Sequence, residues 1–532
     1  SSDDCIDKVF NKKRPDDRKT WLENYDKSAY LDTSSDKVDY EQFMDREMIH
    51  FSTYDCARSI PNMVDGLKIS LRKILFSAFK RKLTSEIKVA QFSGYVSEHS
   101  AYHHGEASLN GAIVNMAQNY VGSNNIHLLQ PNGQFGTRLH GGDDSASERY
   151  IFTMLNPLTR SIFPDADDAI LNYLDDDGTI VEPEFYVPII PFALMNGISG
   201  IGTGFSCSVP AFSPNQIIDY LRFKLRGEEP TAVGEFLPYY EGFKGTIQKV
   251  DNNKYLTKGV YEKIDNDKIR ISELPIGTWT MPYITYLEGL ADGTTDKNGK
   301  KVYPSIRDFT SMSTEVNIDI SVTFPRGKLA ELEGKIDPVT NLNGIQKLLK
   351  LSSSVSSSNM HMFDKECKLK KYGSVEQIIN DFYDVRLATY SKRKKQMIVD
   401  LEKLLVKLSN RAKYILATLD GSVDLRKKNA QTVKELMISK EFDQMDGNFN
   451  YLIKMPMDSV TEENVEKILK EKTDSEKQLN KLKKTTLETM WLSELETLQS
   501  EYKKYQLVRE KIQKGDSSTS VKKVKKRVVK KK

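Results

Sequence analysis

The feature that most constrains this chain is a long helical pattern that no proline or glycine interrupts between Ser374 and Gly421. Apolar residues recur there in alternating steps of three and four, which is the heptad spacing of a coiled coil. They are Ile398, Leu401, Leu405, Leu408, Ala412, Ile415 and Leu419. A second, weaker seam consists of Val465, Ile468, Lys472, Ser475, Leu479 and Leu482. Two helices of similar length predict an antiparallel coiled-coil arm, and two core helices of an ordinary bundle remain the alternative.

The residues between the two seams predict a small globular tip on this arm. Residues 421–458 contain Gly421, Gly447 and Pro456 among scattered apolar side chains, which is enough for a compact module. We therefore expect a first coiled-coil helix at 359–420, the tip at 421–458 and return helices at 459–515. Residues 516–532 are too polar and too charged to fold alone, and we expect a basic disordered tail.

The residue pattern changes twice within the first 358 residues, which predicts a multidomain α+β protein. Residues 1–38 are polar and are interpreted as a connector rather than a domain. Residues 39–178 mix helical patterns with Gly- and Asn-rich turns, and residues 179–358 contain short β-rich runs between Pro and Gly. We expect helices at 72–79 and 106–120, strands at 187–190, 269–271 and 316–322, and a Ser-rich linker at 352–358.

Charge is strongly segregated along the chain. The 532 residues include 78 Lys or Arg and 74 Asp or Glu, which gives a formal net charge of +4. The last twelve residues hold eight Lys or Arg and no acid, so residues 1–520 carry a net charge of −4. Residues 58–88 hold eight basic residues against two acids, and this local excess favours a polyanionic partner. Residues 165–184 hold eight acids and no base.

Two classes of protein are disfavoured by composition. No apolar run approaches the ~20 residues that a membrane-spanning helix needs, so no membrane partner is expected. The cysteines, which are Cys5, Cys56, Cys207 and Cys367, lie far apart without a CxxC pair. This spacing argues against a zinc site and a disulfide framework, and it indicates a reducing compartment.

Residue chemistry alone leaves the candidate sites open. His103 and His104 next to Glu106 could ligate a metal, but adjacent side chains diverge, and we favour polar or phosphate contacts. Residues 200–204 lack the spacing of a nucleotide-binding loop, and their glycines are better suited to a close backbone approach or a tight bend. Ile201 between them is either buried or an apolar wedge that can insert between base pairs.

Two further motifs have a structural and a chemical interpretation. Residues 175–177 are three aspartates followed by Gly178, which favours a surface turn over a metal cluster. Tyr150 follows Arg149. A tyrosine needs a cationic neighbour or a metal to act as a nucleophile, and most tyrosines are structural. The pair therefore predicts no reaction without more specific evidence.

Ordered motifs supply that evidence. They are Arg58-Ser-Ile-Pro61, Val64-Asp-Gly-Leu-Lys68, Lys88-Val-Ala-Gln91, Ala101-Tyr-His-His-Gly-Glu106, Asn119-Tyr-Val-Gly-Ser-Asn-Asn125, Leu129-Gln-Pro131, Gly133-Gln-Phe-Gly-Thr-Arg138, Arg149-Tyr-Ile-Phe-Thr153, Val181-Glu-Pro-Glu-Phe185, Pro188-Ile-Ile-Pro191 and Asn196-Gly-Ile-Ser-Gly-Ile-Gly-Thr-Gly204. Weaker motifs continue to about residue 500, among them Thr278-Trp279 and Leu369-Lys-Lys-Tyr372. In this order and spacing they closely resemble the eukaryotic-type DNA topoisomerase II family (type IIA).

The resemblance implies a breakage–reunion core that lacks the ATPase and TOPRIM domains of that family. It implies a winged-helix domain at 39–178, an α/β tower domain at 179–358, and the coiled-coil arm ending in a small C-terminal gate. Residues 1–38 would be the connector from the missing TOPRIM domain. Mg²⁺ and ATP would be bound by the missing domains, so no metal ligands are expected here. The implied activity is transient cleavage of double-stranded DNA by a homodimer, passage of a second duplex, and resealing.

The family's functional residues can be carried over individually. Tyr150 would attack a DNA phosphodiester, Arg149 would stabilise the transition state, and Ile201 would be the intercalating wedge. The acidic stretch at 165–184 would then face away from DNA. The implied DNA contacts are Arg58, Lys68, Arg72, Lys73, Lys88, Tyr102, His103 and His104, with Lys12 and Lys13 as weaker contacts.

The chain also departs from the family pattern. It has Ile69-Ser-Leu-Arg72 where the family usually has Pro and Gln, Asp143 where Lys is common, and Glu148 just before the Arg-Tyr pair. These departures indicate a divergent lineage, such as a protist or a large DNA virus. The expected location is the nucleus, with a viral host cell or virion as the alternative. Two other classes of function stay open, a DNA-bending architectural protein and a coiled-coil scaffold that docks on chromatin.

Overall fold

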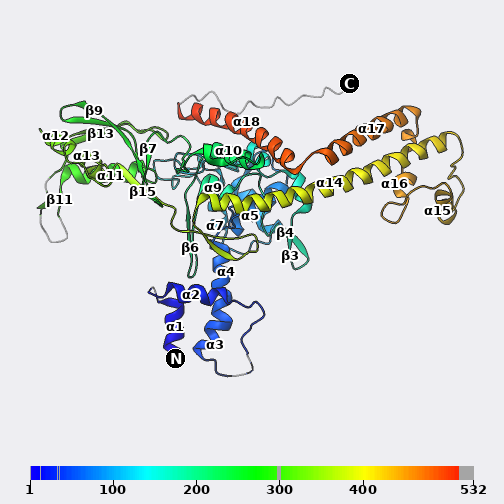
Figure 1. Cartoon of the computed structure of the whole chain (residues 1–532), viewed down its shortest axis with the longest axis horizontal. Helices are drawn as coiled ribbons and strands as arrows, with labels where there is room; N and C mark the ends of the chain where they lie inside the picture. Colours follow the sequence, from blue (N-terminus) through cyan, green and yellow to red (C-terminus); the bar gives the residue numbers. More distant parts are fainter. Residues whose placement is uncertain are drawn as a thin grey trace. The chain divides into compact units, whose positions relative to one another are not determined.

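The computed structural model describes residues 2–514 except 12, 33, 35, 296–300 and 303. The chain separates into two compact units, one of Ser1–Arg386 with Glu494–Lys532 and one of Leu387–Ser493. Each unit is described by itself, with the elements labelled in Figure 1. The predicted tail at 516–532 lies outside the described residues. No helix among the described residues is both long and apolar enough to cross a membrane.

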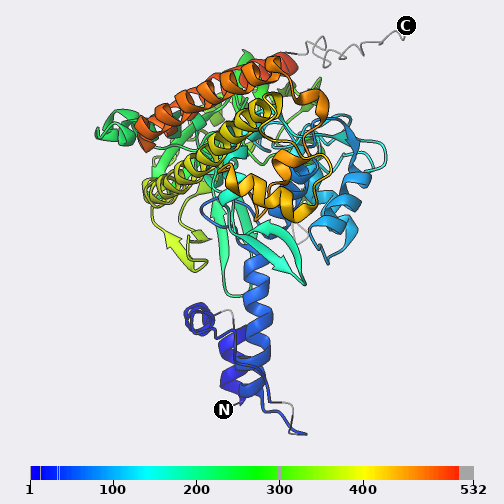
Figure 2. The same ribbon diagram turned by 90° about the vertical axis from the view of Figure 1, so that its right-hand side faces the viewer.

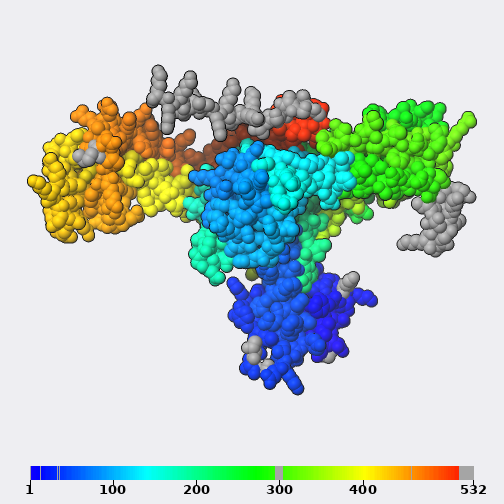
Figure 3. Space-filling model, turned by 180° about the vertical axis from the view of Figure 1, so that it is seen from behind, coloured from blue at the N-terminus to red at the C-terminus, as the bar shows by residue number. Residues whose placement is uncertain are grey.

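The first unit begins with packed helices where the sequence predicted a connector. Helices α1 (Ser2–Phe10) and α2 (Pro15–Glu23) bury Val9 and Trp21, and the Trp21 indole donates to Asp45 Oδ1 at 2.7 Å. A continuous helical segment follows, made of α3 (Tyr40–Phe43), a π-helical stretch (Met44–Met48) and α4 (Ile49–Ser59). Figure 2 shows α4 as one straight helix, and these residues form one packed mass in dark blue in Figure 3.

The next segment contains three helices and a small antiparallel ladder. The helices are α5 (Ile69–Lys80), α6 (Val89–His99) and α7 (Glu106–Ala117), and the ladder pairs β1 (Ile87–Lys88) with β2 (Phe152–Thr153). The two predicted helices in this region are confirmed. The assignment of a winged helix to these elements stays a prediction. Shorter elements follow: α8 (Pro157–Ile162), a 3₁₀ turn (Asp165–Ile170), the hairpin β3 (Tyr173–Asp176) and β4 (Thr179–Pro183), and α9 (Phe192–Asn196).

The hairpin of β5 (Ile198–Ile201) and β6 (Ser206–Val209) and helix α10 (Pro214–Leu225) lead to two antiparallel sheets. A 3₁₀ turn (Pro230–Val233) precedes them. The three-stranded sheet has the order β15 (Ser352–Ser356), β8 (Lys254–Lys258), β7 (Thr246–Asp251). The four-stranded sheet has the order β13 (Asp308–Ser311), β14 (Ile320–Thr323), β10 (Lys268–Glu273), β9 (Val260–Asp265). Helices α11 (Thr280–Asp292), α12 (Lys328–Glu333) and α13 (Gly344–Leu348) share a core with the four-stranded sheet, and a short ladder pairs β11 (Thr294–Thr295) with β12 (Lys301–Val302).

Three expectations about this segment need correction. Residues 187–190 are buried but form no strand, because Pro188 has no N–H for a ladder and Pro191 follows directly. The predicted Ser-rich linker is instead strand β15, since β8 offers it a full antiparallel partner. The hairpin β16 (Met360–Phe363) and β17 (Leu369–Tyr372) follows, so the first arm helix begins at Val375 rather than at 359. The strand predicted at 269–271 is confirmed, and the one at 316–322 begins only at Ile320.

The second unit confirms the antiparallel arm. It takes most of α14 (Val375–Leu419), all of α17 (Glu462–Lys484) and the start of α18 (Leu487–Gln513). Leu408, Ala412 and Ile415 of the first seam share a core with Val465 and Ile468 of the second. Farther along, Lys483 lies 2.8 Å from Glu402. The residue numbers run in opposite directions along the contact, so the two helices are antiparallel.

The predicted tip has its own small core. Along the chain, helices α15 (Ala430–Ser439) and α16 (Asn450–Ile453) and a 3₁₀ turn (Met457–Ser459) come after α14 and before α17. The buried side chains of the tip core are Tyr414, Val423, Met437, Phe442, Phe449 and Leu452.

Candidate nucleic-acid interface

Tyr150 stands on a backbone turn that faces solvent. Its N–H donates to the Ser147 carbonyl at 2.9 Å, and its side chain is 72% exposed. The Arg149 guanidinium carbon lies 5.9 Å from the centre of the Tyr150 ring. The phenol and the guanidinium therefore share one exposed surface.

The N-terminus of α6 holds this turn in place. The amides of Val89 and Ala90 have no partner within their own helix, and they donate to the carbonyls of Ile151 at 3.0 Å and Glu148 at 3.1 Å. Lys88, which is exposed, pairs with Phe152 in the adjoining ladder. The orientation of the Arg149–Tyr150 turn is thus set by helix-end hydrogen bonds, while the side chains stay exposed.

A glycine-rich loop at 133–142 packs behind the turn. A Cβ on Gly136 would lie 2.4 Å from the Gly142 carbonyl oxygen, and one on Gly141 would lie 2.3 Å from the Trp279 Nε1. Both glycines also have positive φ, at 95° and 66°. Only glycine fits such positions. The loop reaches the turn through the Ala146 amide, which donates to the Gln134 carbonyl at 2.9 Å.

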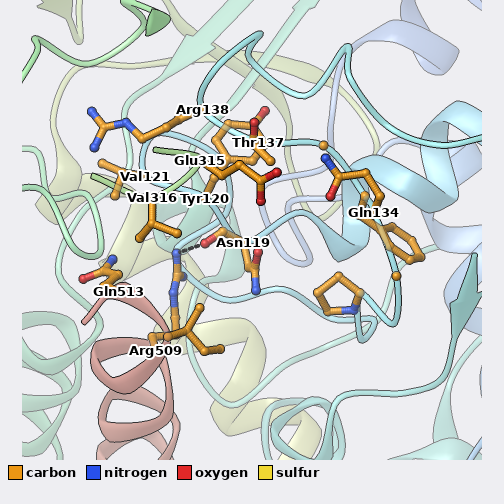
Figure 4. Close-up of a pocket in the computed structure, with 15 residues that line it drawn as sticks. Asn119, Tyr120, Val121, Gln134, Thr137, Arg138, Glu315, Val316, Arg509 and Gln513 are labelled. Atoms are coloured by element: carbon orange, nitrogen blue, oxygen red, sulfur yellow. Dashed lines mark hydrogen bonds between the residues drawn. The ribbon is translucent and has the colours of Figure 1, made fainter. Parts of the chain in front are cut away.

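A cavity of about 310 Å³ adjoins this loop, as Figure 4 shows. Arg509 of α18 lies on its wall and donates to the carbonyls of Asn119, Asn124 and Asn125. None of the predicted DNA contacts lines this cavity. We therefore assign its polar lining to holding α18 against the Asn119–Asn125 motif.

A second cluster forms where α4 meets the loop at 101–104. The Tyr54 hydroxyl lies 2.7 Å from the His104 Nε2, and the Tyr102 ring meets the His104 ring edge-on at 5.4 Å. Burial lowers the pKa of His104, and the charges of Arg58, His103 and Lys73 lower it further. Positive charges therefore act on His104, which suits a contact with a phosphate backbone.

Lys68 lies against the β5–β6 hairpin. It precedes α5, and its Cε would lie 3.4 Å from a Cβ placed on Gly200. Burial lowers the pKa of Lys68. Exposed Lys13 lies in the N-terminal helical segment, and Lys12 lies outside the described residues.

Two of the predicted DNA contacts have structural partners instead. Arg72 is 6% exposed and forms a two-pronged pair with Asp65, at 2.7 and 3.0 Å, so its guanidinium cannot reach a DNA backbone. Lys73 donates to Glu182 at 2.8 Å and to the Ser100 carbonyl, and its side chain is only 13% exposed. We withdraw both from the set of direct DNA contacts.

Ile201 lies at the exposed end of the β5–β6 hairpin, with 85% of its surface accessible. The alternative of a buried isoleucine is therefore wrong. The predicted close backbone approach of the neighbouring glycines is confirmed. A Cβ on Gly200 would lie 1.9 Å from the Ser59 carbonyl oxygen, and one on Gly202 would lie 3.1 Å from the Cys56 Cα. The close neighbour is the C-terminal half of α4.

Three of the eight acids in the stretch at 165–184 pair with Lys or Arg side chains of the protein. Asp168 pairs with Arg160 at 2.9 Å, and Asp167 and Glu182 bind Arg386 and Lys73. Asp176, however, lies 3.5 Å from His103. The expectation that the whole stretch faces away from the DNA contacts therefore needs correction at Asp176.

The other acidic and histidine motifs do not form a metal site. The Gly178 amide donates to Asp175 Oδ1 at 2.7 Å, which confirms the predicted surface turn. His103 and His104 have separate partners, Asp176 and Tyr54. Within the described ranges, no three His, Cys, Asp or Glu side chains gather closely enough to hold a metal ion.

Sequence reasoning missed two residues of α4 that the structure places at this interface. Tyr54 lies four positions before Arg58, which puts both on one helical face, and this spacing could have revealed it. Asp55 accepts two hydrogen bonds from Thr203, and no sequence signal links these residues.

Comparison with known proteins identifies the class to which this fold and site belong. Residues 58–496 match the family of the A subunit of DNA gyrase/topoisomerase IV, and residues 1–56 match the C-terminal associated domain of TOPRIM. The second match and the buried residues of α1 and α2 correct the interpretation of residues 1–38 as a mere connector.

Individual relatives specify the family more closely. The chain is 41% identical over 546 residues to DNA topoisomerase 2 of Arabidopsis thaliana, covering 95% of this chain and 36% of the relative. It is 40% identical over 540 residues to DNA topoisomerase 2-alpha of Mus musculus, covering 93% of this chain and 34% of the relative. The chain belongs to the type II DNA topoisomerase family, with relatives of the eukaryotic type. It spans about a third of the length of these curated relatives.

A solved structure agrees over nearly the whole chain. The crystal structure of the Plasmodium falciparum topoisomerase II DNA-binding, cleavage and re-ligation domain matches with a TM-score of 0.86 and 38% sequence identity. The match covers 97% of this chain and 71% of that chain.

Proposed function

We propose that this chain is the DNA-gate core of a type II DNA topoisomerase, acting on double-stranded DNA as a homodimer with one nucleophile for each strand. The observation that carries the proposal is the exposed Arg149–Tyr150 turn, held by the end of α6 in a chain of this family. The similar Plasmodium falciparum domain is described as a DNA-binding, cleavage and re-ligation domain.

The proposed reaction is a reversible transesterification. The Tyr150 phenol gives up its proton as its oxygen forms a bond to a backbone phosphorus. The bond from that phosphorus to the 3′ oxygen breaks, and the released 3′ oxygen takes up a proton to become a hydroxyl. The protein then carries the 5′ phosphate, and attack by the 3′ hydroxyl reverses the step. Arg149 stabilises the extra negative charge on the phosphate oxygens in the transition state. Strand passage between the two reactions would change DNA topology.

Mg²⁺ and ATP belong to this proposal as cofactors of the complete enzyme. The described residues bring together no set of metal ligands, and the sequence contains no GxxxxGK[ST] loop. The described residues therefore provide no Mg²⁺ site, and we assign both groups to other domains of the complete enzyme. The match of residues 1–56 to a TOPRIM-associated domain supports metal binding by a preceding TOPRIM domain.

DNA binding would combine cationic contacts with a bend. Arg58, Lys68, Lys88, His103 and His104 would meet the backbone, with Lys13 as an outlying contact. Tyr102 is only 8% exposed, and its ring would act by supporting His104. Ile201 would insert between base pairs, because its side chain is almost fully exposed. Bending 20–30 base pairs costs about 1–6 kcal/mol, which the backbone contacts must offset. Binding should therefore depend strongly on salt and little on sequence.

Covalent trapping tests the proposed cleavage. The complete enzyme is incubated with DNA and Mg²⁺ and denatured, and the DNA is examined for protein on its 5′ ends. We expect adducts with the unmodified enzyme and with Tyr30→Phe, which alters another exposed tyrosine. We expect none with Tyr150→Phe, although that variant should still bind DNA. Absence of any adduct from the unmodified enzyme would contradict cleavage and favour an architectural protein or a scaffold.

A bending measurement tests the wedge. Fluorescence transfer between the ends of a short duplex should fall with Ile201→Gly, while binding remains measurable. Ile336→Gly is the matched control, because Ile336 is also exposed, at 63%, but is not a predicted DNA contact. Equal transfer in all three proteins would remove Ile201 from this role.

For the cellular location we propose the nucleus, where a eukaryotic-type enzyme would meet its DNA. A viral host cell or virion is the alternative for a divergent lineage. Imaging the tagged full-length protein in its source cells would decide between these locations.

A further inference from the structure

The hairpin that carries Ile201 depends on other elements for its position. Among the described residues, β5 and β6 form a two-stranded sheet, and outside that ladder the Ser208 N–H of β6 donates to the Asn359 carbonyl at 2.7 Å. An isolated two-stranded hairpin is marginally stable in water. A side chain at its end can insert into DNA at a defined place only if the loop at 202–205 is held. Figure 1 shows β6 beside α4, and residues of that helix contact the glycines at the end of the hairpin.

One carboxylate of α4 makes the principal contact with the loop. Asp55 Oδ2 accepts the Thr203 N–H at 2.8 Å and the Thr203 hydroxyl at 3.0 Å. The Cys56 thiol donates to the Thr203 carbonyl oxygen at 3.1 Å. Thr203 is therefore bonded to α4 through its amide, its hydroxyl and its carbonyl, two residues beyond Ile201.

The glycines of the loop let these bonds form. Gly200 lies against the Ser59 carbonyl and Gly202 against Cys56, where any side chain would clash or crowd. Gly204 has a φ of 80°, and a Cβ there would lie 3.0 Å from the Arg18 side chain. The hairpin thus lies against other parts of the protein at three alternate glycines, and Asp55 and Cys56 make hydrogen bonds to Thr203 between the last two of them.

The sign of the Asp55 charge argues for a positioning role. A carboxylate close to the proposed DNA surface repels phosphates and weakens binding. Its two hydrogen bonds to Thr203 are charge-assisted, which makes them about twice as strong as neutral ones.

We propose that Asp55 is a positioning residue that fixes the β5–β6 loop so that Ile201 can bend DNA. The proposal rests on the proposed function of Ile201 as a wedge. In this proposal Asp55 makes no contact of its own with DNA or with the reacting phosphate. Its effect passes through Thr203 and the loop.

The first test measures bending and binding together in the full chain. We expect Asp55→Ala to reduce the ratio of bent to unbent complexes by about tenfold, the effect of one or two lost hydrogen bonds. DNA affinity at fixed salt should stay the same or rise, because an acid is removed. Asp55→Asn keeps an acceptor oxygen and should give an intermediate value. Glu47→Ala removes an exposed acid from the preceding π-helical stretch and should leave bending unchanged.

Hydrogen exchange in the absence of DNA provides an independent readout. The peptide that contains the Thr203 amide should exchange faster in Asp55→Ala than in the unmodified chain or in Glu47→Ala. Thr203→Val keeps the hydrogen bond from the backbone N–H to Asp55 and loses only the one from the hydroxyl. Its effects on exchange and bending should therefore be smaller than those of Asp55→Ala. This variant also tests the contact if Asp55→Ala fails to fold.

The outcomes separate the two proposals. Unchanged bending in Ile201→Gly would contradict the proposed role of Ile201 as a wedge, irrespective of the result for Asp55→Ala. A bending defect in Ile201→Gly, with normal bending and normal exchange in Asp55→Ala, would overturn the positioning role of Asp55 alone.

Discussion

The Tyr54 hydroxyl lies 2.7 Å from the Nε2 of His104 and joins α4 to the loop after α6. The bond fixes one ring nitrogen of a histidine proposed to contact DNA. We expect Tyr54→Phe to slow DNA cleavage about two- to tenfold, since one hydrogen bond contributes about 0.5–1.5 kcal/mol. Cleavage rates of the complete enzyme would measure this.

The effect should depend on His104. In His104→Gln, the additional change Tyr54→Phe should slow cleavage less than it does alone, because the partner is already gone. Tyr40→Phe, which alters an exposed tyrosine of the same helical segment, should have no effect. If the double variant slows cleavage by the product of the factors measured for the two single variants, the contact between Tyr54 and His104 is contradicted.

Arg72 and Arg58 should behave differently although both lie in the same basic stretch. Arg72→Ala leaves Asp65 buried without its guanidinium, which should cost about 3–5 kcal/mol of folding stability. Arg58→Ala should leave stability nearly unchanged. It should reduce the slope of the logarithm of the DNA-binding constant against the logarithm of salt concentration by about 1, the contribution of one phosphate contact. Chemical denaturation and salt titrations of DNA binding would measure the two effects. A reduced salt slope in folded Arg72→Ala would restore Arg72 to the DNA contacts.

Two glycines offer a matched pair of alanine substitutions. Gly200→Ala would place a methyl group 1.9 Å from the Ser59 carbonyl oxygen, so we expect lower thermal stability and weaker DNA bending. Gly94 is exposed within α6 and has open space at its Cβ position. Gly94→Ala should therefore raise stability by about 0.5–1 kcal/mol. Thermal unfolding of both variants would test the prediction, and equal shifts would contradict it.

His127 should make stability depend on pH. It is buried, its Nδ1 lies 2.8 Å from the Tyr505 hydroxyl, and burial with the nearby Arg509 charge lowers its pKa from 6.5 to about 3. The folded state thus resists protonation, so this contribution is complete above pH 6.5 and is lost as pH falls toward 3.

The slope can reach about 1.4 kcal/mol per pH unit for this one group. Urea unfolding at pH 7, 6 and 5 should therefore show a shallower loss of stability in His127→Gln than in the unmodified chain. His104 and His361, whose pKa values burial also lowers, are present in both proteins and cancel in the comparison. Identical slopes would show that His127 does not contribute.

Much of the fold was predictable where the signal is local. The heptad seams predicted the antiparallel arm, because apolar spacing along a helix specifies which face must be buried. The tip core and the helices α5 and α7 followed from similar patterns. The strand β15 was missed, since a run of serines becomes a strand only when β8 provides the ladder.

The sequence by itself determined the arm, the charge segregation and the ordered motifs around Tyr150, because each depends on residues close together in the chain. Only the tertiary structure decided which basic residues remain available to DNA. Arg72 is paired with buried Asp65, whereas the positive charge of Arg58 acts on His104, although both belong to one basic stretch. It also decided that Asp55 holds Thr203, 148 positions away. Such pairings depend on how distant segments pack, and no local pattern records them.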